Sequence, residues 1–582
     1  MRAIVAGALS ALLVVGGHGV LTGSPETELS TATAAAPAPT VSSPDIPPEV
    51  LTEVVVRGTC QACHNDALLT GNLSLEEFEV GEAPRMARTA EKMIVKLRAG
   101  MMPPPGVRRP GGDTLLALVE TLEGLIDEAA AEDPDPGDRP FQRLNRAEYE
   151  ASIADLLGLE IDAGDYLPLD TKSANFDNIA DVQMLSATLM DAYLQAAAEV
   201  SRLAVGFPDA QPSQTTYSKS GYHSQWDRVE GAPHGTRGGI SVLHNFPADG
   251  EYVLTMAFDH TTTGGFYGNT ARNERIEIAV DGERRALLRV DQFMHVSDPN
   301  MVEMKTEPIP VSAGPHRVSA AFVKRTEGPV PDLLSPHEWS LADRRIGAGG
   351  YGITALPHMK DLAISGPYAV TGVSETPSRR RIFSCRPASP EEARPCAETI
   401  VARLAREAYR RPPTDRDLAD LMSFYDEGAA QAGFELGIRT ALEAILASPD
   451  FVFRFEEPAG RVQPDGTYRI GDLALASRLS FFLWGAPPDD ELVELAAAGR
   501  LSTPEVLEAQ TRRMLADPRA EALGTRFAAQ WLRLQDLDKV HPDRLRYPDY
   551  DQQLADAMRR ETELFFYSLV REDRSLLDLF TA

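Results

Sequence analysis

The chain has 582 residues, a hydrophobic fraction of 43% and a net charge of −29. This length predicts several domains, and the hydrophobic fraction suffices for sizeable cores. The acidic excess argues against nucleic acid as a partner, because its phosphates would be repelled, and it disfavours anionic membrane surfaces.

The N-terminus has the pattern of a secretory signal peptide. Arg2 precedes an apolar run from Ala3 to Val15, and small and polar residues follow it. We therefore predict a signal peptide over residues 1–24 and an exported protein, periplasmic or associated with the cell envelope. The membrane would be a partner only if this segment stayed uncleaved. Residues 25–48 are rich in Ala, Pro, Ser and Thr, which predicts a disordered linker.

The run Cys60-Gln61-Ala62-Cys63-His64 is the most informative motif in the chain. Two cysteines separated by two residues and followed by histidine are typical of c-type haem attachment. Each thiol can form a thioether bond to a haem vinyl group, and the histidine can bind the iron. A zinc site would need about two more ligands at similar spacing, and a redox dithiol would lie beside a βαβ pattern. Neither is present, so we predict one covalently bound haem c, with a chance match as the alternative.

Residues 49–132 are predicted to form a cytochrome c-like haem domain of three helices. The periodicity indicates helices over 50–59, 87–99 and 114–131, with Gly100 ending the second and Asp113 as N-cap of the third. The first of these helices ends at the haem motif.

Two methionines in this domain are candidates for the second axial ligand of the iron. Met101 and Met102 precede three prolines, and proline fixes φ, so the loop can present a thioether rigidly. A thioether at the sixth position raises the reduction potential of haem iron. We predict Met102 as the ligand opposite His64, with Met101 as second choice. The alternative is that both side chains fill a core.

Residues 138–205 are predicted to be a helical module. A second long helix is expected over about 183–204, and the loop of about 15 residues before it is longer than a simple connection requires. The apolar face of the first helix is expected to contain Phe141, Leu144, Tyr149, Ile153 and Leu156.

Residues 206–370 are predicted to form a β-sandwich or jelly roll that follows an irregular segment over 206–236. The basis is a series of short runs, many of which alternate between apolar and polar residues, separated by turn residues. The expected strands are 239–243, 250–259, 275–280, 286–290, 307–311, 316–323 and 358–364.

Amphipathic segments return from about residue 380 and predict two further helical modules, 380–457 and 467–582, with Trp484 and Trp531 as core anchors. The expected fold class is therefore multidomain and mainly α, with one β-sandwich. Cys385 and Cys396 would lie in an oxidising compartment after export, so we expect a disulfide between them. Two buried free thiols are the alternative.

Other polar and aromatic residues carry weaker signals, and no catalytic residue is assigned. Four histidines lie close together in sequence with two aspartates, but their spacing matches no metal-ligand pattern, so we expect surface or core histidines. They are His223, His234, His244 and His260, with Asp227 and Asp259. Several aromatic residues could form a platform for sugar rings, although core packing is the commoner use. They are Tyr217, Tyr222, Trp226, Phe266 and Tyr267, the last two within the glycine-rich run 264–269.

Segments spread over most of residues 55–582 resemble the planctomycete-type multidomain cytochrome c proteins, which are exported and of uncharacterised function. They are CQACHN, KLRAGMMPPPG, FQRLNRAEYEASIADLLGL, GAPHGTRGG, LAREAYRRPPTDRDL, LEAILASPDFVFRFE, ASRLSFFLWGAPPDDEL and LLDLFTA. The resemblance implies covalent haem at Cys60 and Cys63 with His64 as ligand, and a β-domain like a carbohydrate-binding module. Family members commonly continue beyond the last of these segments, so the module over 467–582 is expected to be truncated.

The function expected from these observations is one-electron transfer by an exported haem protein. Its redox partner is a protein that the sequence does not identify, and its β-domain would bind a ligand such as a polysaccharide. One alternative is a carbohydrate-binding scaffold with a peripheral haem. Another is a redox enzyme that uses the cytochrome as an electron relay.

Overall fold

The chain folds into two compact units, an N-terminal unit up to Pro136 and a main unit from Gly137. The predicted signal peptide and all but the last three residues of the predicted linker lie outside the described part. The computed structural model describes residues 46–133, 142–179, 185–219, 223, 225, 227–269, 271–325, 356–456, 458–463, 466–540, 542–543, 546–547, 550 and 552–581.

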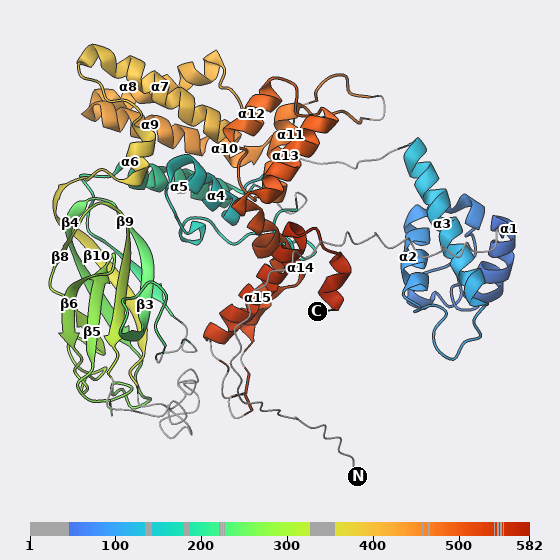
Figure 1. The fold of residues 1–582 in the computed structure, drawn as a ribbon, viewed down its shortest axis with the longest axis horizontal. Coiled ribbons are helices and arrows are strands. Elements are labelled where there is room, and N and C mark those ends of the chain that lie inside the picture. Colours follow the sequence, from blue (N-terminus) through green and yellow to red (C-terminus); the bar gives the residue numbers. More distant parts are fainter. Residues whose placement is uncertain are drawn as a thin grey trace, which may run out of the picture. The chain divides into compact units, whose positions relative to one another are not determined.

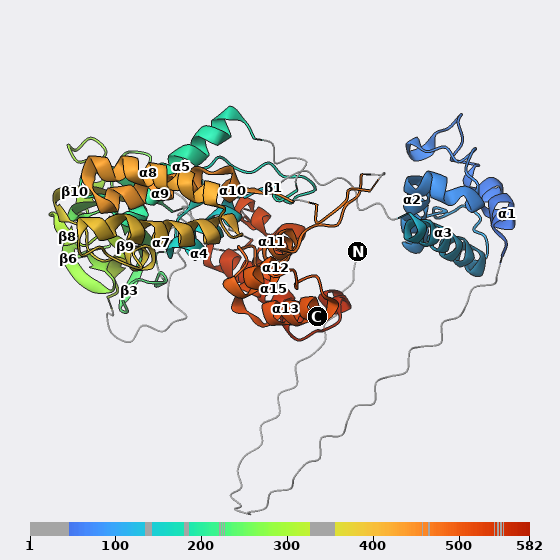
Figure 2. The same ribbon diagram turned by 90° about the horizontal axis from the view of Figure 1, so that it is seen from above.

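The N-terminal unit, blue in Figures 1 and 2, is built of helices around one apolar core. Helix α1 (Pro48–Leu51) runs directly into η1 (Thr52–Cys60), and α2 (Ala87–Arg98) and α3 (Gly112–Glu132) follow. Gly100 adopts φ +63° after α2, as expected of a residue that ends a helix. The prediction that Asp113 is an N-cap is wrong. Helix α3 begins at Gly112, two residues before the predicted start, with Gly111 at the cap and Asp113 in the first turn.

The helical part of the main unit combines segments from both ends of its sequence. It begins with α4 (Arg146–Leu157) and α5 (Ala187–Val205) and resumes after the sheets. One hydrophobic core contains Tyr149 and Ile153 of α4 together with Leu404 and Ile445, which come from far along the chain. The later helices are α6 (Pro377–Ile382), α7 (Pro390–Tyr409), α8 (Asp415–Ala432), α9 (Phe434–Ala447), α10 (Pro449–Val452), α11 (Asp472–Leu483), α12 (Asp490–Ala497), α13 (Pro504–Ala516), α14 (Ala529–Trp531) and α15 (Gln552–Arg571).

The segment before α4 is a strand, although the periodicity predicted a helical face that reaches back to Phe141. Strand β1 (Gln142–Arg143) pairs antiparallel with β11 (Phe453–Arg454), and Phe141 lies outside the described residues. Helix α4 starts after Asn145, whose side chain accepts a hydrogen bond from Glu148 while Glu148 bonds back to the Asn145 N–H. This reciprocal capping box fixes the boundary between strand and helix.

The long loop before α5 docks on a distant part of the helical region. The backbone N–H of Asp177 donates to Gln530 Oε1 at 3.0 Å, and Gln530 Nε2 donates to Asp177 Oδ1 at 3.1 Å. The Phe176 ring stacks on Phe527 with centroids 5.8 Å apart. The loop therefore joins the first helices of the main unit to its last third.

Two antiparallel sheets pack against each other around a second apolar core and form the β-domain, drawn green in Figure 1 except for the yellow β10. One sheet has the order β2-β10-β4-β7 with β8 also paired to β4, and the other has the order β3-β9-β5-β6. The strands are β2 (Ser213–Ser218), β3 (Thr236–Phe246), β4 (Asp249–Phe258), β5 (Arg275–Val280), β6 (Glu283–Arg289), β7 (Glu303–Lys305), β8 (Ile309–Val311), β9 (Gly314–Val323) and β10 (Met359–Gly372). Strand β2 falls within 206–236, which the sequence predicted to be irregular.

Two tryptophans predicted as core anchors behave differently. Trp484 is 3% exposed and its indole N–H donates to the Met514 carbonyl at 3.0 Å. Trp531 is 42% exposed and stacks on Phe527, so its prediction as a core residue is wrong. The region around it is not one long helix but a series of short helical turns.

Candidate functional site

The haem motif lies on a single tight turn at the end of η1. The Cys60 carbonyl accepts hydrogen bonds from the backbone N–H groups of Cys63 at 3.2 Å and His64 at 2.9 Å. Further on, the Leu75 N–H donates to the His64 carbonyl, and the Gln61 side chain donates to the Leu75 carbonyl. The backbone thus holds two cysteines and a histidine on one turn.

The side chains of this turn have the chemistry that covalent haem requires. Both cysteines are half-buried free thiols. Burial, with a smaller contribution from Cys63, raises the pKa of Cys60 to about 11, so its sulfur is a neutral thiol at neutral pH. Nδ1 of His64 is buried and has no hydrogen-bond partner among the described residues, which is costly for an imidazole nitrogen. A donor set of two free thiols and an imidazole with an unpartnered nitrogen fits a c-type haem.

The methionine loop between α2 and α3 is anchored on both sides. The Lys96 carbonyl accepts from the N–H groups of Met101 at 3.0 Å and Met102 at 3.3 Å. Arg109 donates to the carbonyls of Gly100 and Met102, each at 2.9 Å. Met101 is 52% exposed and its sulfur lies 3.6 Å from Lys96 Nζ, whereas Met102 is half-buried.

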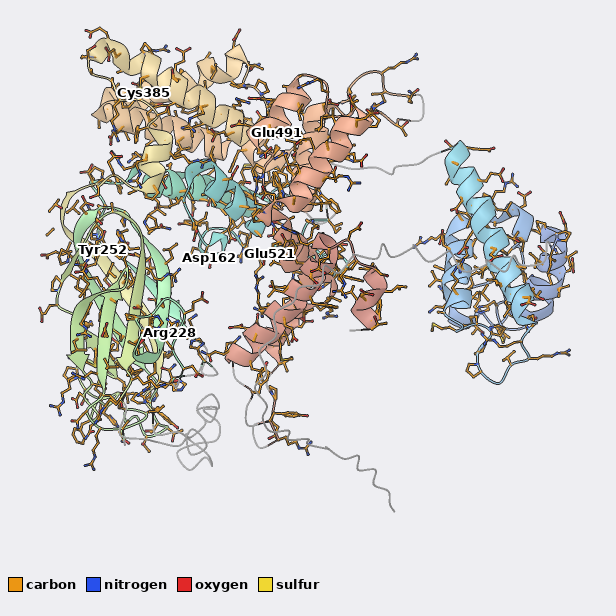
Figure 3. All side chains as sticks on the ribbon, in the orientation of Figure 1. Asp162, Arg228, Tyr252, Cys385, Glu491 and Glu521 are labelled. Carbon is orange, nitrogen blue, oxygen red and sulfur yellow. A yellow bond between two sulfur atoms is a disulfide. The ribbon has the colours of Figure 1, made fainter. Side chains whose placement is uncertain are left out.

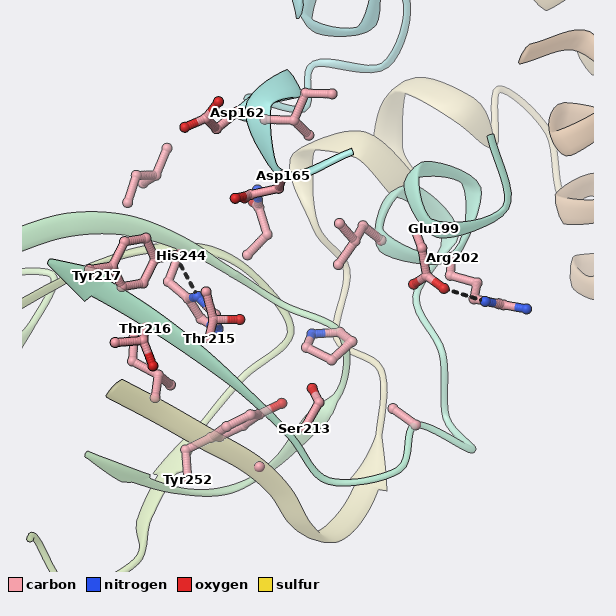
Figure 4. Close-up of a pocket in the computed structure, with 18 of the residues that line it drawn as sticks. Asp162, Asp165, Glu199, Arg202, Ser213, Thr215, Thr216, Tyr217, His244 and Tyr252 are labelled. Carbon is pink, nitrogen blue, oxygen red and sulfur yellow. Dashed lines mark hydrogen bonds and ion pairs between the residues drawn. The ribbon is translucent and has the colours of Figure 1, made fainter. Parts of the chain in front are cut away.

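A second candidate site is a groove of about 690 Å³ in the main unit, shown in Figure 4. It lies between the segment 160–166 and α5 on one side and strands β2, β3 and β4 of the β-domain on the other. Figure 3 shows Asp162 on the helical side and Tyr252 in the β-domain. The polar and aromatic groups that line it include Glu160, Asp162, Asp165, Tyr166, Glu199, Arg202, Ser213, Thr215, Thr216, Tyr217, His244, Asn245 and Tyr252.

A hydrogen-bonded pair of the half-buried Tyr217 and the buried His244 is the central polar feature of this groove. The Tyr217 hydroxyl and His244 Nδ1 are 2.8 Å apart, as the dashed line in Figure 4 marks. Burial lowers the pKa of His244 to about 4, so the ring is neutral at neutral pH. Burial, followed by the charges of Asp165 and Asp162, raises the pKa of Tyr217 to about 12. Burial and the charge of Asp162 also raise the pKa of Asp165.

The structure does not gather the four histidines that lie close together in the sequence. His234 and His260 are exposed, whereas His244 is buried. Among the residues that the structure describes, no three His, Cys, Asp or Glu side chains are placed to hold a metal ion. The two aspartates named with them also differ, since Asp227 is exposed and Asp259 is buried.

Of the three described aromatic residues that were proposed as part of a platform, only Tyr217 lines the groove. Phe266 is 1% exposed in the β-domain core, and the backbone beside it hydrogen-bonds to the segment 294–296, so the run 264–269 does not line the groove. Tyr267 is half-buried nearby, and Tyr222 and Trp226 lie outside the described residues. Sequence reasoning missed Asp162, Asp165 and Tyr166, which lie just before the long loop and carried no signal of their own.

Cys385 and Cys396 are joined by a disulfide with their Cα atoms 6.0 Å apart. Figure 3 labels Cys385 beside the yellow helices of the main unit. Disulfides persist in oxidising compartments, so this bond is consistent with a location outside the cytoplasm. No helix in the described ranges is both long enough and apolar enough to span a membrane.

Comparison with protein families finds three matches, all in the helical part of the main unit. The model PSD3 (protein of unknown function, DUF1587) matches residues 142–206, PSD5 (DUF1595) matches 396–456 and PSD4 (DUF1592) matches 470–582. These planctomycete-type domains support the resemblance for the helical segments. They include neither the haem motif nor the β-domain, so the cytochrome and carbohydrate-binding parts of the resemblance stay predictions. No curated protein matches the chain.

Proposed function

We propose that this protein, whose main unit carries three planctomycete-type segments of unknown function, is an exported c-type haem protein that transfers single electrons. The observation that carries the proposal is the Cys60–His64 turn, with two free thiols and a buried histidine nitrogen that lacks a partner in the part of the chain that the structure describes. When bound, haem supplies an iron centre that cycles between two oxidation states. Cys60 and Cys63 would hold it covalently and His64 would ligate the iron.

The methionine loop would supply the opposite ligand. Its backbone is fixed by the Lys96 carbonyl and by Arg109, so the half-buried Met102 has a defined position. Met101 is the weaker choice because its exposed sulfur lies beside Lys96 Nζ. A thioether in this position raises the reduction potential and keeps exogenous ligands away from the iron, which suits electron transfer.

A second candidate function, a ligand-binding scaffold in which haem is peripheral, is favoured by the groove beside the β-domain. Its size lies within the range of about 300–1,000 Å³ that is usual for ligand sites. The two functions are compatible in one chain, because the haem turn and the groove belong to different compact units.

The haem proposal is tested by producing the full chain in a periplasm with the haem-attachment machinery. We expect one covalent haem per chain by mass and by the pyridine haemochrome spectrum. The variant Cys60→Ala/Cys63→Ala should carry none, whereas Cys385→Ser/Cys396→Ser, the matched control, should still carry one. Wild-type chain that accumulates folded but without covalent haem would refute the proposal.

The axial ligand is tested separately by redox titration of Met102→Ala and Met101→Ala. Loss of the ligand thioether should lower the potential and let imidazole bind to the iron. We expect this for Met102→Ala and little change for Met101→Ala. The reverse pattern would assign the ligand to Met101. No change in either variant would show that neither methionine binds the iron.

A further inference from the structure

The floor of the groove in the main unit carries polar groups that a ligand can reach. His244 is only 9% exposed, and its Nδ1 is engaged by Tyr217, but its Nε2 has no hydrogen-bond partner among the described residues. If the tyrosine hydroxyl donates to Nδ1, then Nε2 carries a proton that needs an acceptor; in the other tautomer, Nε2 is itself an acceptor. In either case Nε2 reaches solvent and is free to bond to water or to a polar group of a ligand.

A second unsatisfied atom lies at the edge of the same groove. The Asn245 side chain donates through Nδ2 to the Glu160 carbonyl at 2.7 Å, whereas its Oδ1 is buried and has no partner within the described ranges. Strand β2 adds hydroxyl groups from Ser213, Thr215 and Thr216. The groove thus offers closely spaced donors and acceptors, a pattern suited to the hydroxyl groups of a saccharide.

Aromatic rings accompany these polar groups. Tyr252 belongs to the β-domain core below the groove and is 1% exposed, so its ring supports the floor and offers no face to a ligand. Tyr166 and Tyr217 also line the groove and are half-buried. Aromatic rings can pack against the apolar faces of sugar rings while hydroxyl groups bond at their edges.

The charge of the groove is strongly one-sided. Four carboxylates line it, from Glu160, Asp162, Asp165 and Glu199, against one guanidinium. That guanidinium, of Arg202, is paired with Glu199 at 2.6 Å. Asp162 and Asp165 are close enough that the charge of Asp162 raises the Asp165 pKa. A ligand cation beside these two carboxylates would relieve their repulsion, whereas an acidic ligand would be repelled.

We propose that this groove binds a saccharide that carries free amino groups. Its hydroxyl groups would bond to His244 and Asn245, its ring faces would pack on tyrosine, and an ammonium group would pair with Asp162 and Asp165. The inference goes beyond the haem function and does not depend on it.

The test is calorimetric titration of the full chain with the trisaccharide of glucosamine and with its N-acetylated counterpart. The two probes share ring and hydroxyl groups and differ in the ammonium charge. We expect the amine form to bind about 10- to 100-fold more tightly, as charged hydrogen bonds imply, and this advantage to shrink as salt is added. The variant Asp162→Asn/Asp165→Asn should abolish the preference, and asparagine can still cap the short turn after residue 162.

A matched control removes two charges elsewhere. The carboxylates of Asp420 and Glu427 are exposed on α8, so Asp420→Asn/Glu427→Gln should keep the preference. Equal affinity for the two trisaccharides, or no binding of the amine form at millimolar concentration, would overturn the proposal. A preference that survives in Asp162→Asn/Asp165→Asn would also overturn it. Binding that persists in Cys60→Ala/Cys63→Ala would separate this result from any failure of the haem proposal.

Discussion

Truncation of one buried carboxylate, Glu148→Ala, should destabilise the main unit severely. The Glu148 side chain is 2% exposed, and its Oε1 lies 3.3 Å from Nη2 of Arg454, whose side chain is 9% exposed. Its Oε2 accepts from the Asn145 N–H at 3.2 Å. Glu148 also helps to compensate the fully buried Arg410, whose pKa falls to about 9, first through burial and then through repulsion by Arg454.

The expected loss of unfolding free energy follows from the buried groups that the substitution leaves without a partner. Removing one partner of a buried ion pair costs about 3–5 kcal/mol, since an uncompensated charge stays buried. The stranded Asn145 N–H can raise the total to about 6 kcal/mol. Glu148→Gln keeps an acceptor for that N–H and loses only the charge, so its cost should be smaller, about 3 kcal/mol.

Urea unfolding followed by tryptophan fluorescence measures this loss in the full chain. The four tryptophans all lie beyond residue 136, so the signal reports on the main unit alone. Arg416→Ala is the control, because its pair with Asp420 is 3.7 Å apart and both side chains are largely exposed. It should change stability by less than about 1 kcal/mol. A loss below about 1 kcal/mol for Glu148→Ala, or an equal loss for the control, would refute the reasoning.

Three further predictions concern the main unit. The disulfide closes a span of 11 residues, so Cys385→Ser/Cys396→Ser should cost about 2.8 kcal/mol in urea unfolding, and a reductant should affect the wild type only. The folded pKa of His244, about 4, lies below its unfolded value of 6.5. The contribution of His244 to the free energy of unfolding is therefore complete above pH 6.5 and falls by about 3 kcal/mol as the pH drops to 4. The difference in unfolding free energy between wild type and His244→Gln should change by that amount over the same pH range. Gly239 has φ +82°, and a Cβ there would lie 2.0 Å from a carbonyl oxygen of the neighbouring strand, so Gly239→Ala should lower the thermal midpoint far more than Gly282→Ala, where φ is +77° but the space is open.

Local periodicity predicted most of the helices and strands because their apolar residues repeat with the period of the element. It failed where pairing decides the structure. Strand β2 has mostly exposed positions and no clear apolar alternation, and it is a strand because it pairs with the long β10. Gln142 and Arg143 continue the polar and apolar pattern of α4, but a partner about 310 residues away draws them into a strand.

The two candidate sites also differ in how far the sequence alone could predict them. The residues of the haem turn are consecutive, so their spacing alone carries the chemistry. The groove combines a short turn near residue 162, an edge strand and His244 from a third segment. Sequence reasoning named both residues, but it grouped Tyr217 with other aromatic residues and His244 with other histidines. Nothing in a linear pattern shows that these two side chains meet. Only the fold brings a tyrosine hydroxyl within 2.8 Å of that imidazole.

The shared core of the helical segments determines which parts of the chain can be deleted or produced alone and still fold. The chain leaves the helical region after Val205 and returns at α6, where Arg379 donates to the Val205 carbonyl and Val373 lies against Gly206. The β-domain is thus an insertion whose two ends meet, a geometry that tolerates gain or loss of a whole domain. A short linker in place of residues 207–373 should leave the helical body folded, whereas the matched segment 142–206 should not fold alone, because half of its core is supplied from beyond the insertion. The family matches over 142–206 and 396–456 therefore trace one interrupted core, whereas the match over 470–582 is built mainly around a core of its own.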